Sequence, residues 1–254
     1  MAARTRPRND VRQYDDLVEQ WSDPDGAFAM LFWLAAARAE LVPPAPAAGA
    51  VLVDIACGGG LFAPHAARLG YRHVGVDLSR SALRVAADRD VLAVQGDVLR
   101  LPIRSGSADV VVAGEVLEHV RDLPGLVAEV CRALRPGGLM VIDTIAATTF
   151  GRLTSVTVGE RIPGGPPPGI HDPALFVDRA LLRGEFARHG VQIQLAGLRL
   201  PALSYLRWAW ARFRRQFSRR PGERCSTPLP RVEFRSTRST AGLFQGHGTK
   251  EASG

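Results

Sequence analysis

The residues with the clearest chemical potential are two carboxylates and an imidazole that follow an apolar run at 109–113. Glu115, Glu118 and His119 are spaced i, i+3 and i+4, so they would lie on one side of a helix that began there. Mixed carboxylate and imidazole sets can bind Mg²⁺, Mn²⁺ or Zn²⁺. The three residues are therefore a candidate site for a divalent cation such as Mg²⁺.

Two histidines are candidates for a catalytic general base. His119 follows a predicted strand, and ligands of parallel sheets bind at the carboxyl ends of the strands. His171 lies near the end of the Pro/Gly-rich stretch 159–172, "GERIPGGPPPGIHD", which could fold over a substrate as a lid. Each histidine also has a structural interpretation: His119 could fix a turn or pack, and His171 could cap a loop.

A glycine turn follows the first strongly apolar run, in "VLVDIACGGGLF" at 51–62. Gly58, Gly59 and Gly60 would let the backbone turn sharply and approach a ligand closely. The next β run ends in Asp77, whose carboxylate could accept hydrogen bonds from both hydroxyls of a ribose. The pattern fits an adenosine ligand, either a nicotinamide dinucleotide or S-adenosylmethionine, and a bare tight turn is the alternative.

The elements that must position these residues alternate between strands and helices. Apolar β runs and helical stretches that alternate in this way predict an α/β, Rossmann-like fold with a mostly parallel sheet covered by helices on both faces. The expected strands are 50–55, 73–78, 91–94, 109–113, 139–144 and 191–198, and the expected helices are 61–69, 79–88, 122–134 and 173–189.

The remaining segments divide the chain into a core and its extensions. We expect one domain over 13–205, with a cofactor-binding core at 50–144 and an irregular substrate-capping insert at 145–172. Helices are expected at 13–42, broken near Asp23-Pro24-Asp25-Gly26. We predict a disordered basic N-terminus at 1–12, and a basic aromatic segment and disordered tail over 206–254.

Composition indicates a protein of the cytoplasm. The three cysteines show no pairing pattern, which favours a reducing compartment. No apolar run reaches the roughly 18–20 residues that a membrane-spanning helix needs. The net charge is +7, and the basic residues concentrate at the two ends of the chain.

One basic segment could contact a membrane peripherally. Within 203–220, the residues Leu206, Trp210, Phe213 and Phe217 form an apolar stripe among arginines. Such a helix could lie on an anionic bilayer or pack its stripe on the domain. Nucleic-acid binding is disfavoured because no recognition motif accompanies the arginines.

The order of motifs after the glycine turn narrows the ligand. "QGDVLRLP" (95–102), "AGEVLEHV" (113–120) and "LRPGGLMVIDT" (134–144) together resemble class I S-adenosylmethionine-dependent methyltransferases. The resemblance implies a seven-stranded sheet and S-adenosylmethionine as the cofactor. It implies that the cofactor contacts Asp54, Gly58, Gly60, Asp77, Leu78, Asp97, Val98 and Glu115.

The resemblance is closest to the ubiquinone-biosynthesis O-methyltransferases. The shared features are an Asp-Pro-x-Gly turn in the N-terminal segment, the E-x-x-E-H pattern of Glu115, Glu118 and His119, and "GIHD" at 169–172. Ala56 and Ile170 depart from residues usual in that family. Membership would imply a small aromatic acceptor, methylated on a phenolic hydroxyl of a prenylated ring, and a divalent cation at the E-x-x-E-H motif.

Three other functions remain compatible with the sequence. The first is methyl transfer to another acceptor, at carbon, nitrogen or the hydroxyl of a sugar or natural product. The second is a nicotinamide-dependent oxidoreductase, since "GGGLFA" also fits G-x-G-x-x-A. The third is a non-catalytic adenosine-binding module.

Overall fold

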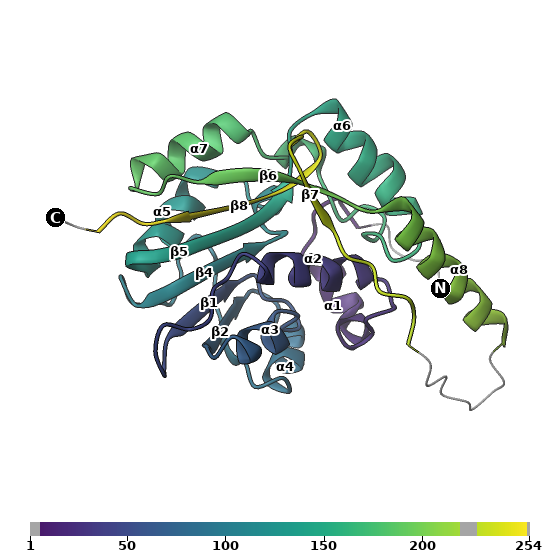
Figure 1. The fold of residues 1–254 in the computed structure, drawn as a ribbon, viewed down its shortest axis with the longest axis horizontal. Helices are drawn as coiled ribbons and strands as arrows, with labels where there is room; N and C mark the ends of the chain where they lie inside the picture. The colour runs from purple at the N-terminus through teal and green to yellow at the C-terminus, as the bar shows by residue number, and fades with distance from the viewer. Residues whose placement is uncertain (1–5, 219–227, 253–254) are drawn as a thin grey trace.

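The fold is a single mixed sheet with helices on both faces. The computed structural model describes residues 6–218 and 228–252, and the sheet order is β3-β2-β1-β4-β5-β8-β6-β7 (Figure 1). The strands β1 to β5 pair in parallel, whereas β8 is antiparallel to both β5 and β6. The strands are β1 (Val51–Ile55), β2 (Arg72–Asp77), β3 (Leu92–Gln95), β4 (Ala108–Gly114), β5 (Leu134–Ile145), β6 (Gln194–Arg199), β7 (Arg235–Thr237) and β8 (Leu243–Thr249).

Successive strand residues serve two separate cores, as the pleat of a doubly covered sheet requires. Val53 of β1 packs in a core with the helices α5 and α7, whereas the preceding Leu52 packs in a second core with α2, α3 and α4. The expected Rossmann-like architecture is thus confirmed. The helices are α2 (Ala29–Ala39), α3 (Ala63–Arg68), α4 (Arg80–Ala87), α5 (Leu123–Ala133) and α7 (Arg179–Arg188).

The expectation of seven strands is wrong, and so is that of a disordered tail for residues 228–252; residues 219–227 and 253–254 of the expected tail lie outside the described residues. β7 and β8 both lie beyond residue 218, and β8 is inserted in the sheet between β5 and β6. The sequence of β8, "LFQGHGT", contains only one of the β-branched residues typical of strands, Thr249 at its end. Gly246 and Gly248 are needed there, because a Cβ at Gly246 would crowd Leu195 of β6 and a Cβ at Gly248 would crowd the carbonyl of Gln192, just before β6.

The insert after β5 is more regular than expected. A helical run continues through α6 (Thr149–Arg152), the π-helical η3 (Leu153–Val158) and the 3₁₀ turn η4 (Gly159–Arg161). It begins at Thr148, whose hydroxyl accepts a hydrogen bond from the Gly151 amide. The stretch 162–172 has neither helix nor strand, as predicted, and the following helix α7 begins only after its cap Asp178.

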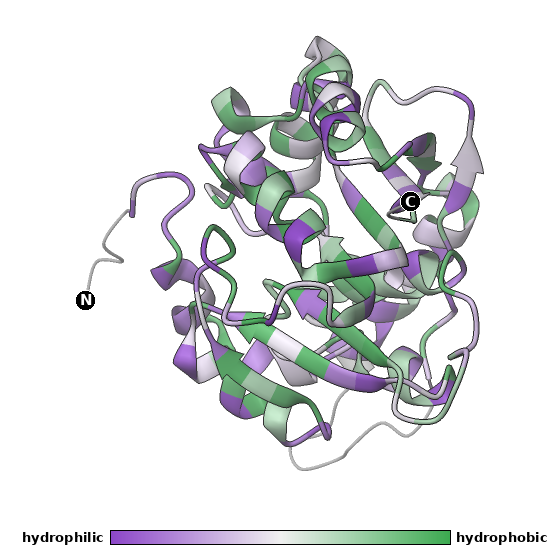
Figure 2. Cartoon of the chain, turned by 90° about the vertical axis from the view of Figure 1, so that its left-hand side faces the viewer, coloured by the Kyte–Doolittle hydropathy of each residue, from purple (hydrophilic) through white to green (hydrophobic). Residues whose placement is uncertain are grey.

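The described segments near the two ends of the chain lie against the core, whereas residues 1–5 and 253–254 lie outside the described ranges. The N-terminal residues from 6 onward, expected to be disordered, lead into α1 (Arg12–Asp16) and η1 (Val18–Ser22). The C-terminal part includes the long helix α8 (Ala202–Ser218). Hydrophobic residues concentrate in the central strands, whereas the helices contain both hydrophobic and hydrophilic residues (Figure 2). Within the described ranges, no helix is both long and apolar enough to cross a bilayer.

Candidate functional site

A cavity of about 950 Å³ lies at the carboxyl ends of β1, β2 and β4. One part of its wall is the glycine turn with Asp54 and Asp77, and another part holds His119 and His171. Apolar side chains make up much of the rest, including Phe28, Leu31, Phe150, Val158, Ile162 and Ile170. One cavity therefore joins the expected cofactor residues to the expected catalytic residues.

The glycine turn has a conformation that side chains disfavour. Gly58 and Gly60 have φ of 50° and 73°, and a Cβ at Gly58 would collide with the indole of Trp21. Ala56, which replaces the glycine usual in the resembling family, also has a positive φ of 52°. Its backbone therefore carries a strain of about 1–2 kcal/mol that glycine would avoid.

Asp77 connects the end of β2 to this turn. Its Oδ2 accepts a hydrogen bond from the Gly58 amide at 2.9 Å, and its Oδ1 accepts one from the Ser79 amide at 2.8 Å. Burial raises the pKa of this carboxyl, although the two amides oppose the shift. Each oxygen retains a second lone pair, so the carboxylate could still accept hydrogen bonds from a ligand.

A buried ion pair lies beside Asp54 in the same wall. Arg38 of α2 and Asp143 of β5 are buried, with Nη1 of the arginine 2.5 Å from Oδ2 of the carboxylate. Arg38 Nε has no hydrogen-bond partner among the described residues. The Oδ2 atom of Asp54 lies 3.4 Å from Nε2 of His73. Arg38 was not predicted as a site residue, although a lone arginine within an apolar helix is a signal that could have identified it.

Three of the expected cofactor contacts, Leu78, Asp97 and Val98, differ in their position relative to the cavity. Val98 is buried and lines the cavity, as does the half-exposed Leu78. Asp97 is exposed and does not line the cavity. Its Oδ1 accepts a hydrogen bond from the Leu99 amide at 2.9 Å, so Asp97 stabilises a local turn.

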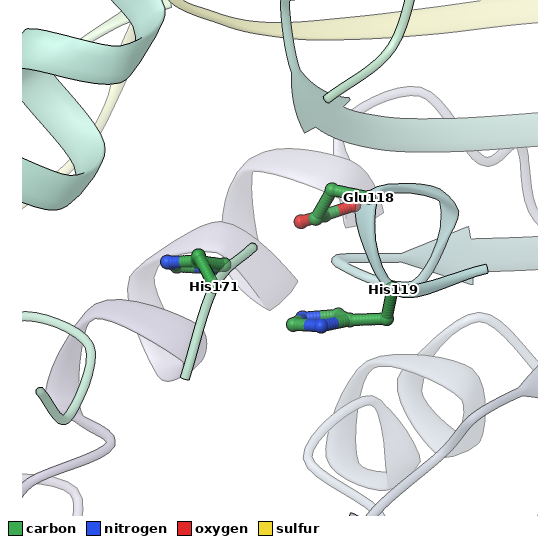
Figure 3. A group of neighbouring side chains, drawn as sticks. All are labelled: Glu118, His119 and His171. Atoms are coloured by element: carbon green, nitrogen blue, oxygen red, sulfur yellow. The ribbon is translucent and has the colours of Figure 1, made fainter. Parts of the chain in front are cut away.

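Glu118, His119 and His171 form the candidate metal-binding group. One potential ligand atom from each lies within 4.8 Å of the others (Figure 3). The imidazoles stack with their centroids 5.3 Å apart. The expectation that Glu115 completes the group on one helical face fails, because the 3₁₀ turn η2 (Leu117–His119) begins only after Glu115. His171, from the distant insert, takes the third position.

The N-terminal segment holds the His119 ring. Asn9 Nδ2 donates to the carbonyl of His119 at 3.0 Å, and Asn9 Oδ1 lies 2.6 Å from His119 Nδ1. Since the amide oxygen can only accept, Nδ1 carries the hydrogen and Nε2 keeps its lone pair. The Tyr14 hydroxyl lies 3.3 Å from that Nε2.

The same segment fastens the insert that carries His171. Arg8 Nη1 donates to the His171 carbonyl at 2.7 Å and to Glu160 Oε1 at 3.0 Å. The backbone N–H of Asn9 donates to the Gly169 carbonyl at 3.2 Å. Sequence reasoning missed Arg8, Asn9 and Tyr14, because their roles arise from contacts with residues more than a hundred positions away.

Burial determines the protonation of the group. It lowers the pKa of His119 to about 3 and that of His171 to about 4. It raises the pKa of Glu118 to about 7, against the opposing hydrogen bond that Thr144 Oγ1 donates to Glu118 Oε2 at 2.6 Å. Both imidazoles are therefore neutral at pH 7 and can act as acceptors or metal ligands. Such acidic conjugate acids make them weak bases toward a phenol, whose pKa is about 10.

The fold and this cavity define an S-adenosylmethionine-dependent methyltransferase. Residues 53–142 match the family model described as a methyltransferase domain. A ubiquinone biosynthesis O-methyltransferase of Ralstonia nicotianae is 35% identical over 202 residues, which cover 74% of this chain and 83% of the relative. One of Methylobacterium sp. is 34% identical, with coverage of 70% and 80%. The chain belongs to the ubiquinone biosynthesis O-methyltransferase family.

Solved structures agree on the fold. An S-adenosylmethionine-dependent methyltransferase of Thermotoga maritima superimposes with a TM-score of 0.60 at 16% identity, covering 94% of this chain and 97% of that one. A phosphoethanolamine N-methyltransferase of Haemonchus contortus gives a TM-score of 0.54 at 16% identity, covering 96% of this chain and 54% of that one. Identities this low support the architecture and leave the acceptor open.

We expect Asn9→Ala to release the His119 ring while the fold persists. The substitution removes the hydrogen bonds to His119 Nδ1 and to the His119 carbonyl, so the free energy of unfolding should fall by about 1–3 kcal/mol in urea titrations. The ¹⁵N chemical shifts of the imidazole should then report mixed tautomers. Arg12→Ala, in the same segment but exposed, should leave both measurements unchanged. An unaltered tautomer in Asn9→Ala would contradict the assigned contact.

Proposed function

We propose that this enzyme transfers the methyl group of S-adenosylmethionine to a phenolic hydroxyl on a hydrophobic, prenylated acceptor. The observation that carries the proposal is the shared cavity. One part of it has the glycine turn that would hold a nucleoside, and another part has His119 and His171 within largely apolar walls. The relatives named ubiquinone biosynthesis O-methyltransferases support oxygen as the methylated atom.

Residues around the glycine turn would hold the donor. Asp77 is placed to accept hydrogen bonds from the ribose hydroxyls, and Leu78 and Val98 offer apolar contacts near the adenine. Arg38 and Asp54 carry opposite charges on the same wall, and so suit the carboxylate and the ammonium of the methionine end. Gly58 and Gly60 keep the backbone close to that end.

Catalysis by this chain would rest mainly on orientation. Methyl transfer is an in-line displacement from a sulfonium, which is already a good leaving group, so the acceptor oxygen must be aligned with the methyl carbon. The apolar walls would exclude water and bind the ring, and His119 and His171 would face its hydroxyl. Asn9 holds His119, and Arg8 holds the segment of His171, so neither side chain needs to reorganise when the acceptor binds.

The donor set formed by Glu118, His119 and His171 fits a divalent cation. It offers one buried carboxylate and two neutral imidazoles whose ligand atoms converge within 4.8 Å. Glu118 Oε1 has no partner among the described residues, which is costly for a buried oxygen unless a ligand uses it. When bound, a cation here would supply positive charge that lowers the pKa of the acceptor phenol. His119 and His171 would then act as ligands rather than as bases.

Labelled methyl transfer tests the reaction. The purified full chain, given S-adenosylmethionine with a ¹³C-methyl group and a prenylated catechol, should yield a product heavier by one labelled methyl and S-adenosylhomocysteine in equal amount. Mass spectrometry after fragmentation should locate the label on oxygen. Label on ring carbon or on nitrogen, or no coproduct with any phenolic acceptor, would refute O-methylation.

Asp77→Ala should weaken donor binding at least about a hundredfold in calorimetry, because it removes the ribose acceptor and loosens the glycine turn. Asp97→Ala is the matched control: it removes a carboxylate that lies after the neighbouring strand β3 but off the cavity wall. The control should bind the donor within about twofold of wild type. Equal losses in the two variants would argue against the ribose assignment.

Mn²⁺ titration followed by electron paramagnetic resonance tests the cation site without any turnover. Glu118→Gln and His171→Ala should each weaken Mn²⁺ binding at least about tenfold, since each removes one of three protein ligands. Glu19→Gln, an exposed carboxylate on η1, should have no effect. If wild type and Glu118→Gln bind Mn²⁺ equally, the cation proposal fails, and a loss of turnover in His119→Ala or His171→Ala would instead favour a base.

A further inference from the structure

One face of α8 is fixed to the body of the protein by aromatic packing and by Asp25. Trp208 is only 1% exposed and packs edge-on to Trp33, with ring centroids 4.9 Å apart. Trp208 Nε1 donates to Asp25 Oδ1 at 3.3 Å, and Arg215 pairs with Asp25 Oδ2 at 3.0 Å. Arg212 donates to the Asp25 carbonyl. These contacts set the rotation of the helix about its axis.

The opposite face of α8 is apolar and exposed. Leu203, Leu206, Trp210 and Phe213, here called the outer face, are 63%, 61%, 62% and 51% exposed. Leu206 and Trp210 of the stripe predicted from sequence are therefore exposed rather than packed on the domain, and contact of the stripe with a membrane stays a prediction. The side chain of Phe217 lies outside the described residues. Contiguous exposed apolar side chains of this size mark an interaction surface.

The charge of the segment selects the partner. From Arg199 to Gly222 the sequence has seven arginines and no acidic residue. Arg207 and Arg214 flank the outer face and are exposed, as is Arg199 just before the helix. Two such helices from two copies would oppose arginine with arginine, which disfavours self-association through this face. An anionic bilayer satisfies both features, because lipid tails accept the apolar residues while arginines reach the head groups.

The N-terminal end of α8 lies close to residues at the mouth of the cavity. Phe150 and Val158, of the helical run that follows β5, are both half-exposed and both line the cavity. The loop after that run lies against α8, since the Tyr205 hydroxyl donates to the Pro163 carbonyl at 3.1 Å. Leu200, directly before α8, also lines the cavity. Figure 1 shows this helical run and α8 on the same side of the molecule, away from α7.

We propose that the outer face of α8, with its flanking arginines, docks this enzyme on an anionic lipid bilayer so that the cavity opens toward the membrane. Docking by itself does not depend on the reaction; that it delivers a lipid-tailed acceptor to the cavity rests on the proposed function. The partner is the lipid surface, recognised through its negative head groups and apolar interior.

Vesicle co-sedimentation of the full chain tests the proposal. Wild type should sediment with vesicles of phosphatidylcholine mixed with phosphatidylglycerol, and at least about tenfold less with phosphatidylcholine alone. Leu206→Ser/Trp210→Ser, and separately Arg207→Glu/Arg214→Glu, should each weaken binding to the mixed vesicles at least about tenfold. Leu181→Ser, which removes an exposed leucine from α7, should bind as wild type does.

Donor binding separates the two proposals. All three variants should retain wild-type affinity for S-adenosylmethionine in calorimetry and wild-type circular dichroism, because none lies in the donor part of the cavity. Wild type that stays in the supernatant with mixed vesicles overturns the docking proposal even if methyl transfer is confirmed. The proposal also fails if Leu206→Ser/Trp210→Ser binds like wild type, if it converts a dimer to a monomer without lipid, or if the face binds duplex DNA in preference to vesicles.

Discussion

The buried ion pair between Arg38 and Asp143 is the interaction on which the site depends. It joins α2 of the N-terminal segment to β5 of the sheet, with an N···O distance of 2.5 Å. Asp143 Oδ1 also accepts a hydrogen bond from the Glu115 amide, and so supports the left-handed backbone, φ 51°, through which the chain turns after β4. That turn brings His119 to the cavity wall and places the buried Glu118 close to it. Removing one partner of such a pair typically costs about 3–5 kcal/mol, because the other charge stays buried.

The cavity is closed by segments that lie far apart in the sequence. The core strands supply the glycine turn and Asp77, whereas Asn9, Tyr14 and His171 come from the N-terminal segment and the insert. Gly114 has no side chain at the point where the Arg38 guanidinium crosses, and a Cβ there would collide with it. The site is therefore assembled only when α2, the insert and the sheet have packed together. In the proposed mechanism, this assembly aligns the acceptor without a large rearrangement.

Local patterns in the sequence were enough to predict the part of the fold made by alternating strands and helices. The five parallel strands and the turn at Gly58 follow from apolar runs, glycines and an acid at a strand end, all of which act over a few residues. β8 was missed because its residues suit a strand only beside the close-packed backbones of β5 and β6.

Tertiary contacts decided the rest of the site. The presence of His171 rather than Glu115 beside His119 depends on where the insert folds. The contact between Asn9 and His119 joins positions 110 residues apart, so no local spacing reports it. Periodicity also did not predict which face of α8 packs on the domain, because it is the opposite face, with Trp208, that is buried.

A crystal structure of the protein with S-adenosylhomocysteine bound would test the central claim most directly. The account predicts that the ribose hydroxyls contact Asp77 and that the sulfur points across the cavity toward Glu118, His119 and His171. A coproduct bound elsewhere, or one whose sulfur faces away from the two histidines, would contradict it.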